Sequence, residues 1–343
     1  MSRRGTMPQA LAILMCFILH GSDVFADATG IRFRISLENT PAHIQSQSVK
    51  RFALLLSEKA GNRLNVEYYD SASLFRDTDV FSALTEGKVE MAVPGIWHVA
   101  SFVPDVNIFL LPAFYGRDAR ENHAVLESDA GKELDARIED SLGVKVPGKW
   151  FDLGYANLYT VKHKLLSLGD IDGLKIRVAG GVANEMRIEA AGARATSIPW
   201  PDFPIWLDRG EVDGVLTTHE TVRSAELWTH GLRYCLEDRQ YFPMYVPMIS
   251  ERVWKILPED IQRAILEAWE ETAAWERDMA AKAQREARND LEAHGVEIVV
   301  PQRSEILKWR ERLGHSQDAI ITRVGLDKEF ALRAVRSLEN QAP

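Results

Sequence analysis

A stretch of about 37 residues without a helix breaker, from Pro258 to His294, limits the shapes open to this chain. Proline is tolerated in the first turn of a helix, and side chains suited to a buried face then recur at helical spacing: Ile261, Ala264, Ile265, Ala268, Trp269, Thr272, Ala273 and Trp275. An unbroken helix of this length spans roughly 55 Å at ~1.5 Å per residue. Because that exceeds the diameter of one lobe, we predict a helix that braces two lobes. A protruding coiled coil is the alternative, but the heptad is lost beyond Met279.

The first residues have the pattern of an export signal. Arg3 and Arg4 precede an apolar run from Ala10 to Leu19, which is too short to span a bilayer. Val24 to Ala26 then offers residues that a signal peptidase accepts before its cut. We therefore expect a cleaved signal and a mature periplasmic chain that begins near Asp27.

Size, cysteine content and charge narrow the class further. Removal of 26 of the 343 residues leaves 317, about the size of two lobes. Cys16 leaves with the signal; because Met15 stands where a lipoprotein signal needs a small residue, we expect no lipid anchor. Cys235 then has no intramolecular partner, so the hydrophobic core must hold the fold. A formal net charge of −9 argues against a nucleic acid or an anionic membrane as partner, because both need basic patches.

The first half of the mature chain follows a β-α-β pattern. Apolar and charged side chains alternate from Ile31 to Leu37 and again from Leu64 to Tyr69, as they do in strands. The segment between them, Ser46 to Lys59, has helical spacing. A helix from Val80 to Glu86 and a strand from Val89 to Val93 complete a first α/β lobe.

The same pattern recurs in a second set of elements that begins near Val144. We predict strands at Leu158 to Val161, Leu174 to Val178 and Val212 to Val215, and helices at Asn184 to Ala191 and Phe203 to Arg209. A strand from Val296 to Val300 and a helix from Ser304 to Asn340 end the chain. The predicted fold class is α/β with two lobes, divided into a signal at 1–26, mainly a first lobe at 27–150, mainly a second lobe at 151–250, and at 251–343 the bracing helix with a segment that returns to the first lobe.

Signs of catalysis are few. The sequence contains no GxSxG, P-loop, HExxH or paired CxxC motif. His219 and His230 lack a third ligand at metal spacing, and Gly180-Gly181 lacks the third glycine of a dinucleotide-binding loop. We therefore expect a protein that is not an enzyme and has no cofactor and no metal; an exported lyase or hydrolase is the rival from another class.

One arginine stands where open α/β sheets bind ligands. In the run DGLKIRV, Leu174, Ile176 and Val178 alternate toward the core, which places Arg177 on the other face near the carboxyl end of the strand. A guanidinium there matches a carboxylate with two parallel hydrogen bonds. Taken alone, an arginine in a strand is more often a solvated charge.

The run DIDGLKIRV resembles the signature of the extracytoplasmic solute-binding subunits of TRAP transporters, the DctP family. Three other segments agree in order and spacing: LFRDTDVFSALTEGKVEMAV, GARATSIPWPDFPIWLDRGEVDGV and ISERVWKILPEDIQRAILEAWEE. The resemblance implies two α/β lobes joined by crossing strands, closing over a small organic carboxylate that is passed to TRAP membrane subunits. It also implies that Arg177 forms the ion pair with the ligand carboxylate. We expect a monomer, with Arg177 hydrated in the open, ligand-free cleft. An exported sensor-partner or binding module on the same fold remains the alternative.

At one position the sequence departs from the family. A second family arginine lies twenty residues before the first, where this chain has Asn157. An amide donates hydrogen bonds but adds no charge, so a second anionic group would be poorly held. This favours a monocarboxylate or a hydroxy or keto acid over a C4-dicarboxylate, unless the pairing of positions is wrong by one residue.

The resemblance carries over other site residues. Asp79 stands at the family's acidic position and Trp200 at its aromatic position, while Thr217 replaces a polar residue that reaches the ligand. Gln240 and Tyr241 lie where the family places another polar contact. Aromatic residues that flank the proposed cleft in sequence are candidates for its wall, although packing in the core is the commoner role for any one of them: Trp97, Trp150, Phe151 and Tyr155.

Overall fold

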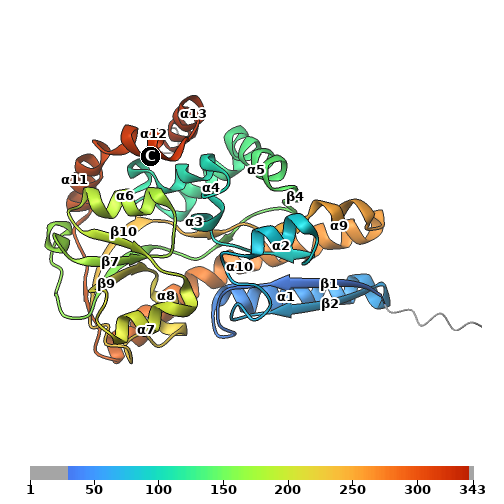
Figure 1. Ribbon diagram of the computed structural model, residues 1–343, viewed down its shortest axis with the longest axis horizontal. Coiled ribbons are helices and arrows are strands. Elements are labelled where there is room, and N and C mark those ends of the chain that lie inside the picture. The colour runs from blue at the N-terminus through green and yellow to red at the C-terminus, as the bar shows by residue number, and fades with distance from the viewer. Residues whose placement is uncertain (1–29, 340–343) are drawn as a thin grey trace, which may run out of the picture.

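A computed structural model describes residues 30–339 of the chain. The predicted signal and its cleavage site lie outside the described residues. Within residues 30–339, no helix combines the length and the apolar character that a membrane crossing needs. Figure 1 shows two α/β lobes with helices on their outer faces, as predicted.

The first lobe contains a five-stranded sheet in the order β2-β1-β3-β12-β4. β1 and β2 are parallel, and α1 connects them, which completes the predicted β-α-β unit. The strands are β1 (Ile31–Ser36), β2 (Leu64–Tyr69), β3 (Met91–Ala92), β12 (Met248–Ser250) and β4 (Val144–Lys145). The helices around this sheet are α1 (Ile44–Ala60), α2 (Val80–Glu86), α3 (Ile96–Val99), α4 (Ala119–Glu127), α5 (Asp129–Leu142) and α9 (Glu251–Ile256).

The second lobe contains a six-stranded sheet in the order β13-β10-β6-β9-β7-β8. Its strands are β13 (Glu297–Val299), β10 (Tyr234–Tyr241), β6 (Ala156–Thr160), β9 (Gly214–Thr217), β7 (Lys175–Val178) and β8 (Arg194–Ser197). Its helices are α6 (Val182–Ala190), α7 (Phe203–Asp208) and α8 (His219–Ser224). The predicted strand at Val212 begins two residues later, at Gly214.

Two antiparallel segments carry the chain between the lobes. β5 (Phe151–Asp152) leads into β6, and β10 leads through β11 (Met244–Tyr245) into β12 of the first sheet. β5 pairs with β11 midway between the two sheets, with Tyr245 opposite Phe151. We call residues 151–160 and 234–250 the crossing segments.

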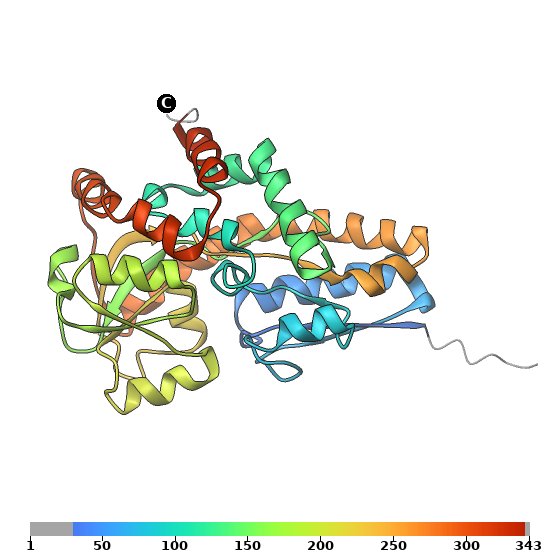
Figure 2. The ribbon, with the colours of Figure 1, turned by 45° about the horizontal axis from the view of Figure 1, so that its top comes forward.

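The long helix α10 (Glu259–Ala293) runs unbroken and contacts both lobes. It packs against α1 of the first lobe, β5 of the crossing segments and α8 of the second lobe; Figure 2 shows it behind the sheets, spanning most of the molecule. Pro258 is the residue before its first turn, where a missing N–H costs nothing. The prediction of one bracing helix is confirmed.

The predicted helix from Ser304 to Asn340 is wrong as a single element. The structure has three helices there: α11 (Arg303–Gly314), α12 (Gln317–Val324) and α13 (Lys328–Glu339). Gly325 ends α12 in the left-handed conformation at φ 72°, and the Asp327 carboxylate accepts hydrogen bonds from the amides of Glu329 and Phe330 at the start of α13. These stop and start signals let α12 pack on α6 while α13 packs on α4 and α5.

Candidate functional site

A pocket lies between the two lobes, and the crossing segments form one of its walls. It contains about 420 Å³ of empty space, counted to its open mouth. The residues that line it are Glu38, Asn39, Asp77, Trp97, His98, Leu153, Arg177, Ala179, Trp200, Leu216, Thr217, Thr218, Thr221, Tyr241, Pro243 and Tyr245. Several follow the carboxyl ends of β1, β7 and β9, the edge at which open α/β sheets bind ligands.

Arg177 is held by backbone and aromatic contacts rather than by water. Only 2% of its surface is exposed, and its Nε and Nη2 donate hydrogen bonds of 3.0 and 2.8 Å to the carbonyl oxygen of Ile198. The guanidinium lies 5.6 Å from the Trp200 ring centroid and 5.0 Å from that of Phe203. Arg177 is therefore buried rather than hydrated in this structure; the expectation of a hydrated Arg177 concerns an open, ligand-free cleft and stays a prediction.

Burial also sets the charge state of Arg177. Desolvation lowers the pKa of its guanidinium to about 10, although Asp77 and Glu38 oppose the shift. The side chain therefore stays protonated at neutral pH. A cation in so dry a place is attracted to an anion that enters beside it far more strongly than a surface arginine is.

Opposite Arg177, a histidine bridges two carboxylates. His98 Nε2 lies 3.4 Å from Asp77 and 3.5 Å from Glu38. Burial alone would lower the pKa of His98, but hydrogen bonding to Asp77 and Glu38 outweighs it and raises the pKa to about 9. Hydrogen bonding to His98 overcomes desolvation in turn and lowers the pKa of Asp77. At neutral pH the cleft therefore holds two cations, Arg177 and His98, beside the carboxyl groups of Asp77 and Glu38.

The same three residues have the donor atoms of a metal site. Oxygens of Glu38 and Asp77 and a ring nitrogen of His98 lie within 4.8 Å of one another. The raised pKa of His98 means that, without a metal ion, its proton is shared with both carboxylates; a metal ion would have to displace that proton. The trio therefore acts as a hydrogen-bonded ion cluster that offers carboxylate oxygens to the pocket.

Contacts across the mouth hold the lobes together. The Trp200 amide donates to Asp77 Oδ2 at 3.4 Å, and Arg76 Nη2 forms a 2.8 Å ion pair with Asp202. A Cβ on Gly181, whose φ is +84°, would lie 3.2 Å from the carbonyl oxygen of Trp97. The glycine at this position lets the second lobe approach α3 of the first.

Half of the predicted site residues line this pocket and half do not. Those that line it are Arg177, Trp97, Trp200, Thr217 and Tyr241. Asp79 is exposed just before α2, and Asp77, two residues earlier, faces the pocket instead. Gln240 lies in β10 with its side chain buried, where it forms hydrogen bonds with Arg187 and Asp238; strand alternation gives its neighbour Tyr241 the opposite direction.

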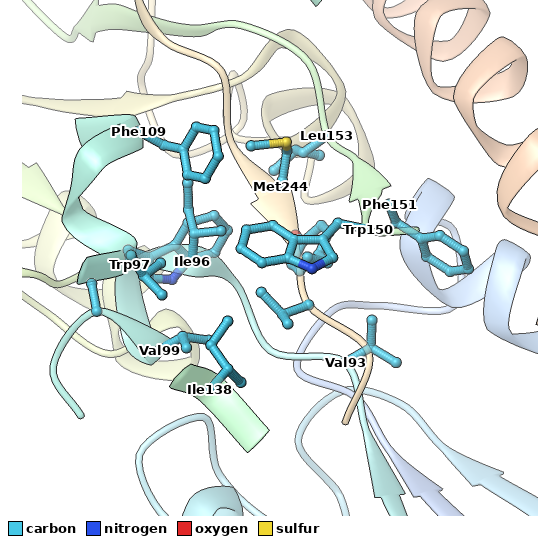
Figure 3. Packing of buried hydrophobic residues seen from close by; sticks show 14 of the residues in the cluster. Val93, Ile96, Trp97, Val99, Phe109, Ile138, Trp150, Phe151, Leu153 and Met244 are labelled. Atoms are coloured by element: carbon cyan, nitrogen blue, oxygen red, sulfur yellow. The ribbon is translucent and has the colours of Figure 1, made fainter. Parts of the chain in front are cut away.

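Trp150 and Phe151 belong to the core rather than to the cleft wall. Trp150 packs edge-to-face on Phe109 at 5.7 Å, and its Nε1 donates to Asp135 at 2.9 Å. Figure 3 shows Trp150 between Phe109, Leu153, Phe151 and Met244. Phe151 stacks on Trp269 of α10, so both rings serve the junction of the lobes.

Asn157 and Tyr155 line a different cavity. Asn157 is fully buried; its Oδ1 accepts from the amide of Arg239 at 3.0 Å and its Nδ2 donates to the carbonyl of Tyr155. A pairing wrong by one residue would move the comparison to Ala156 or Leu158, which are both apolar and buried. At none of the three positions does β6 supply a second cation to the cleft.

Sequence reasoning missed the acidic half of the pocket. Glu38 and Asn39 lie two and three residues after the end of β1, so the rule that ligands bind at the carboxyl ends of strands is sufficient to predict them as site residues. His98 adjoins Trp97 in α3, which is too short to show periodicity. Asp77 lies in a turn, where neighbouring side chains diverge in directions that no period predicts.

These features define a class of protein: two α/β lobes, joined by crossing segments and a bracing helix, enclose a small charged pocket, as in extracytoplasmic solute-binding proteins. The model of the DctP family, described as bacterial extracellular solute-binding protein, family 7, matches residues 35–322. The chain belongs to this family.

Curated relatives are distant but extend over most of the chain. The C4-dicarboxylate-binding periplasmic protein DctP of Rhodobacter capsulatus is 23% identical over 298 residues, which cover 84% of this chain and 86% of that protein. A solute-binding protein of Chromohalobacter salexigens is 24% identical and covers 75% of this chain and 76% of its own. Family members are transport binding proteins rather than enzymes, and the family is periplasmic in bacteria.

Solved structures share the fold. A sugar acid binding protein from Advenella mimigardefordensis, in complex with galactonate, has a TM-score of 0.86 at 19% identity and covers 92% of this chain and 99% of its own. A TRAP periplasmic solute-binding protein from Ralstonia eutropha, with bound (S)-2-acetolactate, has a TM-score of 0.83 at 23% identity, with coverage of 90% and 99%. One from Sulfurospirillum deleyianum, with bound succinate, has a TM-score of 0.82 at 20% identity and covers 89% and 98%.

Proposed function

We propose that this protein captures a small organic monocarboxylate in the interlobe pocket, with Arg177 as the carboxylate anchor, and delivers it to the membrane subunits of a TRAP transporter. The observation that carries the proposal is the guanidinium of Arg177, protonated and almost fully buried at the pocket. Its Nε and Nη2 bind the Ile198 carbonyl, which fixes the plane of the guanidinium before the ligand arrives. Such preorganisation lowers the entropic cost of binding.

The polar groups of the pocket favour a hydroxy or keto acid. A carboxylate beside Arg177 leaves the rest of the solute near Glu38, Asp77, Thr217 and Tyr241. Carboxylate oxygens accept hydrogen bonds from hydroxyls and repel a second carboxylate, and the hydroxyls of Thr217 and Tyr241 can donate to a keto oxygen. Because β6 adds no cation, a C4-dicarboxylate would bury an unpaired charge. The galactonate and acetolactate in two solved relatives are acids of the favoured kind.

A thermal-shift screen over organic acids tests the proposed function. A solute that binds only the native state adds about 2.7 kcal/mol at a hundred times its dissociation constant, which raises the melting temperature by several degrees. We expect this rise with a 2-hydroxy or 2-keto monocarboxylate or an aldonate, and a much smaller one with succinate at equal concentration. A rise with succinate as large as with any monocarboxylate would contradict the proposed class of solute.

The His98 ion cluster predicts a pH dependence of stability. The folded-state pKa of His98, about 9, lies above the unfolded value of about 6.5, so its contribution is complete below pH 6.5 and is lost as the pH rises through 9. We expect the contribution of His98 to lower the free energy of unfolding by about 2 kcal/mol between pH 6 and pH 9. Each pKa unit corresponds to ~1.4 kcal/mol, and local rearrangement around the deprotonated ring reduces the full value. His98→Gln should flatten that part of the profile.

Urea unfolding at pH 6, 7.5 and 9 measures this effect. His230→Gln is the matched control, because His230 pairs with Asp208 on the surface of the second lobe, outside the pocket. Parallel profiles for the parent and the His98→Gln variant would show that the cluster does not hold the proton assigned to it.

A further inference from the structure

We propose that a second cavity, between α4, α10 and the crossing segments, is a binding site for a small organic anion with an apolar body. This inference does not depend on the function proposed for the interlobe pocket. The two sites share no lining residue. Leu153, Thr218 and Tyr241 line the interlobe pocket, whereas the residues that directly follow them in the chain, Gly154, His219 and Phe242, line the second cavity.

The cavity is large and has an apolar wall. It contains about 1320 Å³ of empty space, counted to its open mouth, against about 420 Å³ in the interlobe pocket. Tyr155 and Phe242 form part of the wall with rings 5.3 Å apart, edge to face, and Ala274 and Ala281 of α10 face them. Small side chains on the helix keep this space open for a flat or aliphatic group.

Cations outnumber anions around this cavity in a protein whose net charge is −9. Five arginines line it, Arg120, Arg239, Arg277, Arg285 and Arg288, against Asp152, Glu237 and Asp278. Two of the five also have partners beside the cavity: Arg120 pairs with Asp118 and Arg277 with Glu127. Glu237 forms ion pairs with Arg288 at 2.9 Å and with Arg239 at 3.7 Å. Arg285 is exposed on α10 and forms no ion pair among residues 30–339, so its hydrated charge is available to a ligand.

Two further polar side chains, those of Arg239 and His219, line the cavity in conformations that are unfavourable without a ligand. Arg239 has a φ of 53°, rare for a residue with a side chain, where the register of β10 shifts; such bulges redirect side chains, and the conformation costs of order 1 kcal/mol. Its guanidinium lies 4.8 Å from the Tyr155 ring centroid. His219 is 6% exposed and its Nδ1 bonds the Tyr159 hydroxyl at 2.5 Å.

His219 Nε2 is buried and forms no short hydrogen bond among the described residues. The Glu237 carboxylate lies 3.6 Å away, within ion-pair distance, and His219 helps to lower its pKa. A ring nitrogen with so distant a partner gains from a bound polar group that forms a full hydrogen bond with it. Arg239, Arg285 and His219 line the same cavity as Tyr155 and Phe242, so an anion bound there would meet these polar groups and rest its apolar body on the two rings. The chemistry therefore specifies an aromatic or aliphatic carboxylate or sulfonate.

Fluorescence titration with 8-anilinonaphthalene-1-sulfonate tests this site, because the probe joins an aromatic body to one sulfonate. We expect saturable binding of one probe per folded chain. Arg285→Glu should weaken it at least tenfold, and Arg239→Ser should weaken it as well. Lys282→Glu is the matched control: it makes the same charge change at another exposed residue of α10, one that does not line the cavity, and should change the dissociation constant less than twofold.

Two controls distinguish binding in this cavity from binding in the interlobe pocket and from an effect of net charge. Arg177→Ala should leave probe binding within a factor of two, because the interlobe pocket is not involved; loss of binding in that variant would place the probe in the interlobe pocket and overturn the proposal. If Lys282→Glu and Arg285→Glu weaken binding equally, the effect is one of net charge and the proposal is overturned. An absence of saturable binding would also overturn the proposal. Melting curves establish that each variant is folded.

Discussion

Replacement of Trp269 by alanine is expected to lower the free energy of unfolding by about 3–5 kcal/mol, the usual cost of truncating a buried tryptophan. Trp269 is fully buried on α10. Its ring stacks on Phe151 of the crossing segments at 4.2 Å and meets Phe52 of α1 edge-on at 5.1 Å. Its Nε1 donates a 2.8 Å hydrogen bond to the carbonyl of Lys149. The side chain of Trp269 thus joins α10 both to the first lobe and to the crossing segments.

Urea denaturation measures this loss, and Trp275→Ala is the matched control. Trp275 is a partly exposed tryptophan on the same helix, 5.2 Å from the guanidinium of Arg51, and its truncation should cost about 1 kcal/mol. A loss at Trp269 no larger than that at Trp275 would mean that α10 does not brace the lobes through this contact.

Arg177→Ala is expected to weaken binding of the solute by ~10²–10⁴, because removal of one partner of a buried ion pair costs roughly 3–5 kcal/mol at ~1.4 kcal/mol per decade. Arg177→Lys should recover only part of this loss, since an ammonium cannot make the fork of hydrogen bonds that a guanidinium makes. Calorimetric titration with the acid found in the thermal-shift screen measures both variants.

Stability must be followed in parallel, because Arg177 also holds the Ile198 carbonyl. Its removal leaves that carbonyl unpaired, at about 1–3 kcal/mol, but also removes a desolvated charge. Arg76→Ala is the control at the mouth: it breaks the exposed pair with Asp202, which is worth less than about 1 kcal/mol. Binding by Arg177→Ala within threefold of the parent would mean that the carboxylate is anchored elsewhere.

The sequence predicts the elements of this fold well where one periodic signal extends without interruption. The run after Pro258 predicts α10 because no glycine or proline competes with its apolar face. The segment after Ser304 lacks proline too, yet Gly325 and Asp327 supply a stop and a start that divide it. Such caps act over a single turn, so a pattern averaged over many residues conceals them.

Site residues can be predicted from the sequence where they lie on a strand, because alternation fixes the direction of each side chain. Site residues in turns are harder to predict. Arg177 follows from strand alternation and from the edge rule for open sheets. The choice between Asp77 and Asp79 depends on how a turn packs against the second lobe. Trp150 and Gln240 have the residue types of a binding site, but the sequence contains no signal that their partners, Asp135 and Arg187, lie in the interior.

Native mass spectrometry of the protein, purified without denaturation from the periplasm of the bacterium that expresses it, tests the central claim most directly. We predict that the parent carries one small organic monocarboxylic acid per chain, identified by its mass after release, and that the Arg177→Ala variant carries none while it remains folded. An acid retained equally by the Arg177→Ala variant, or a dicarboxylate as the bound species, would contradict this account of the pocket.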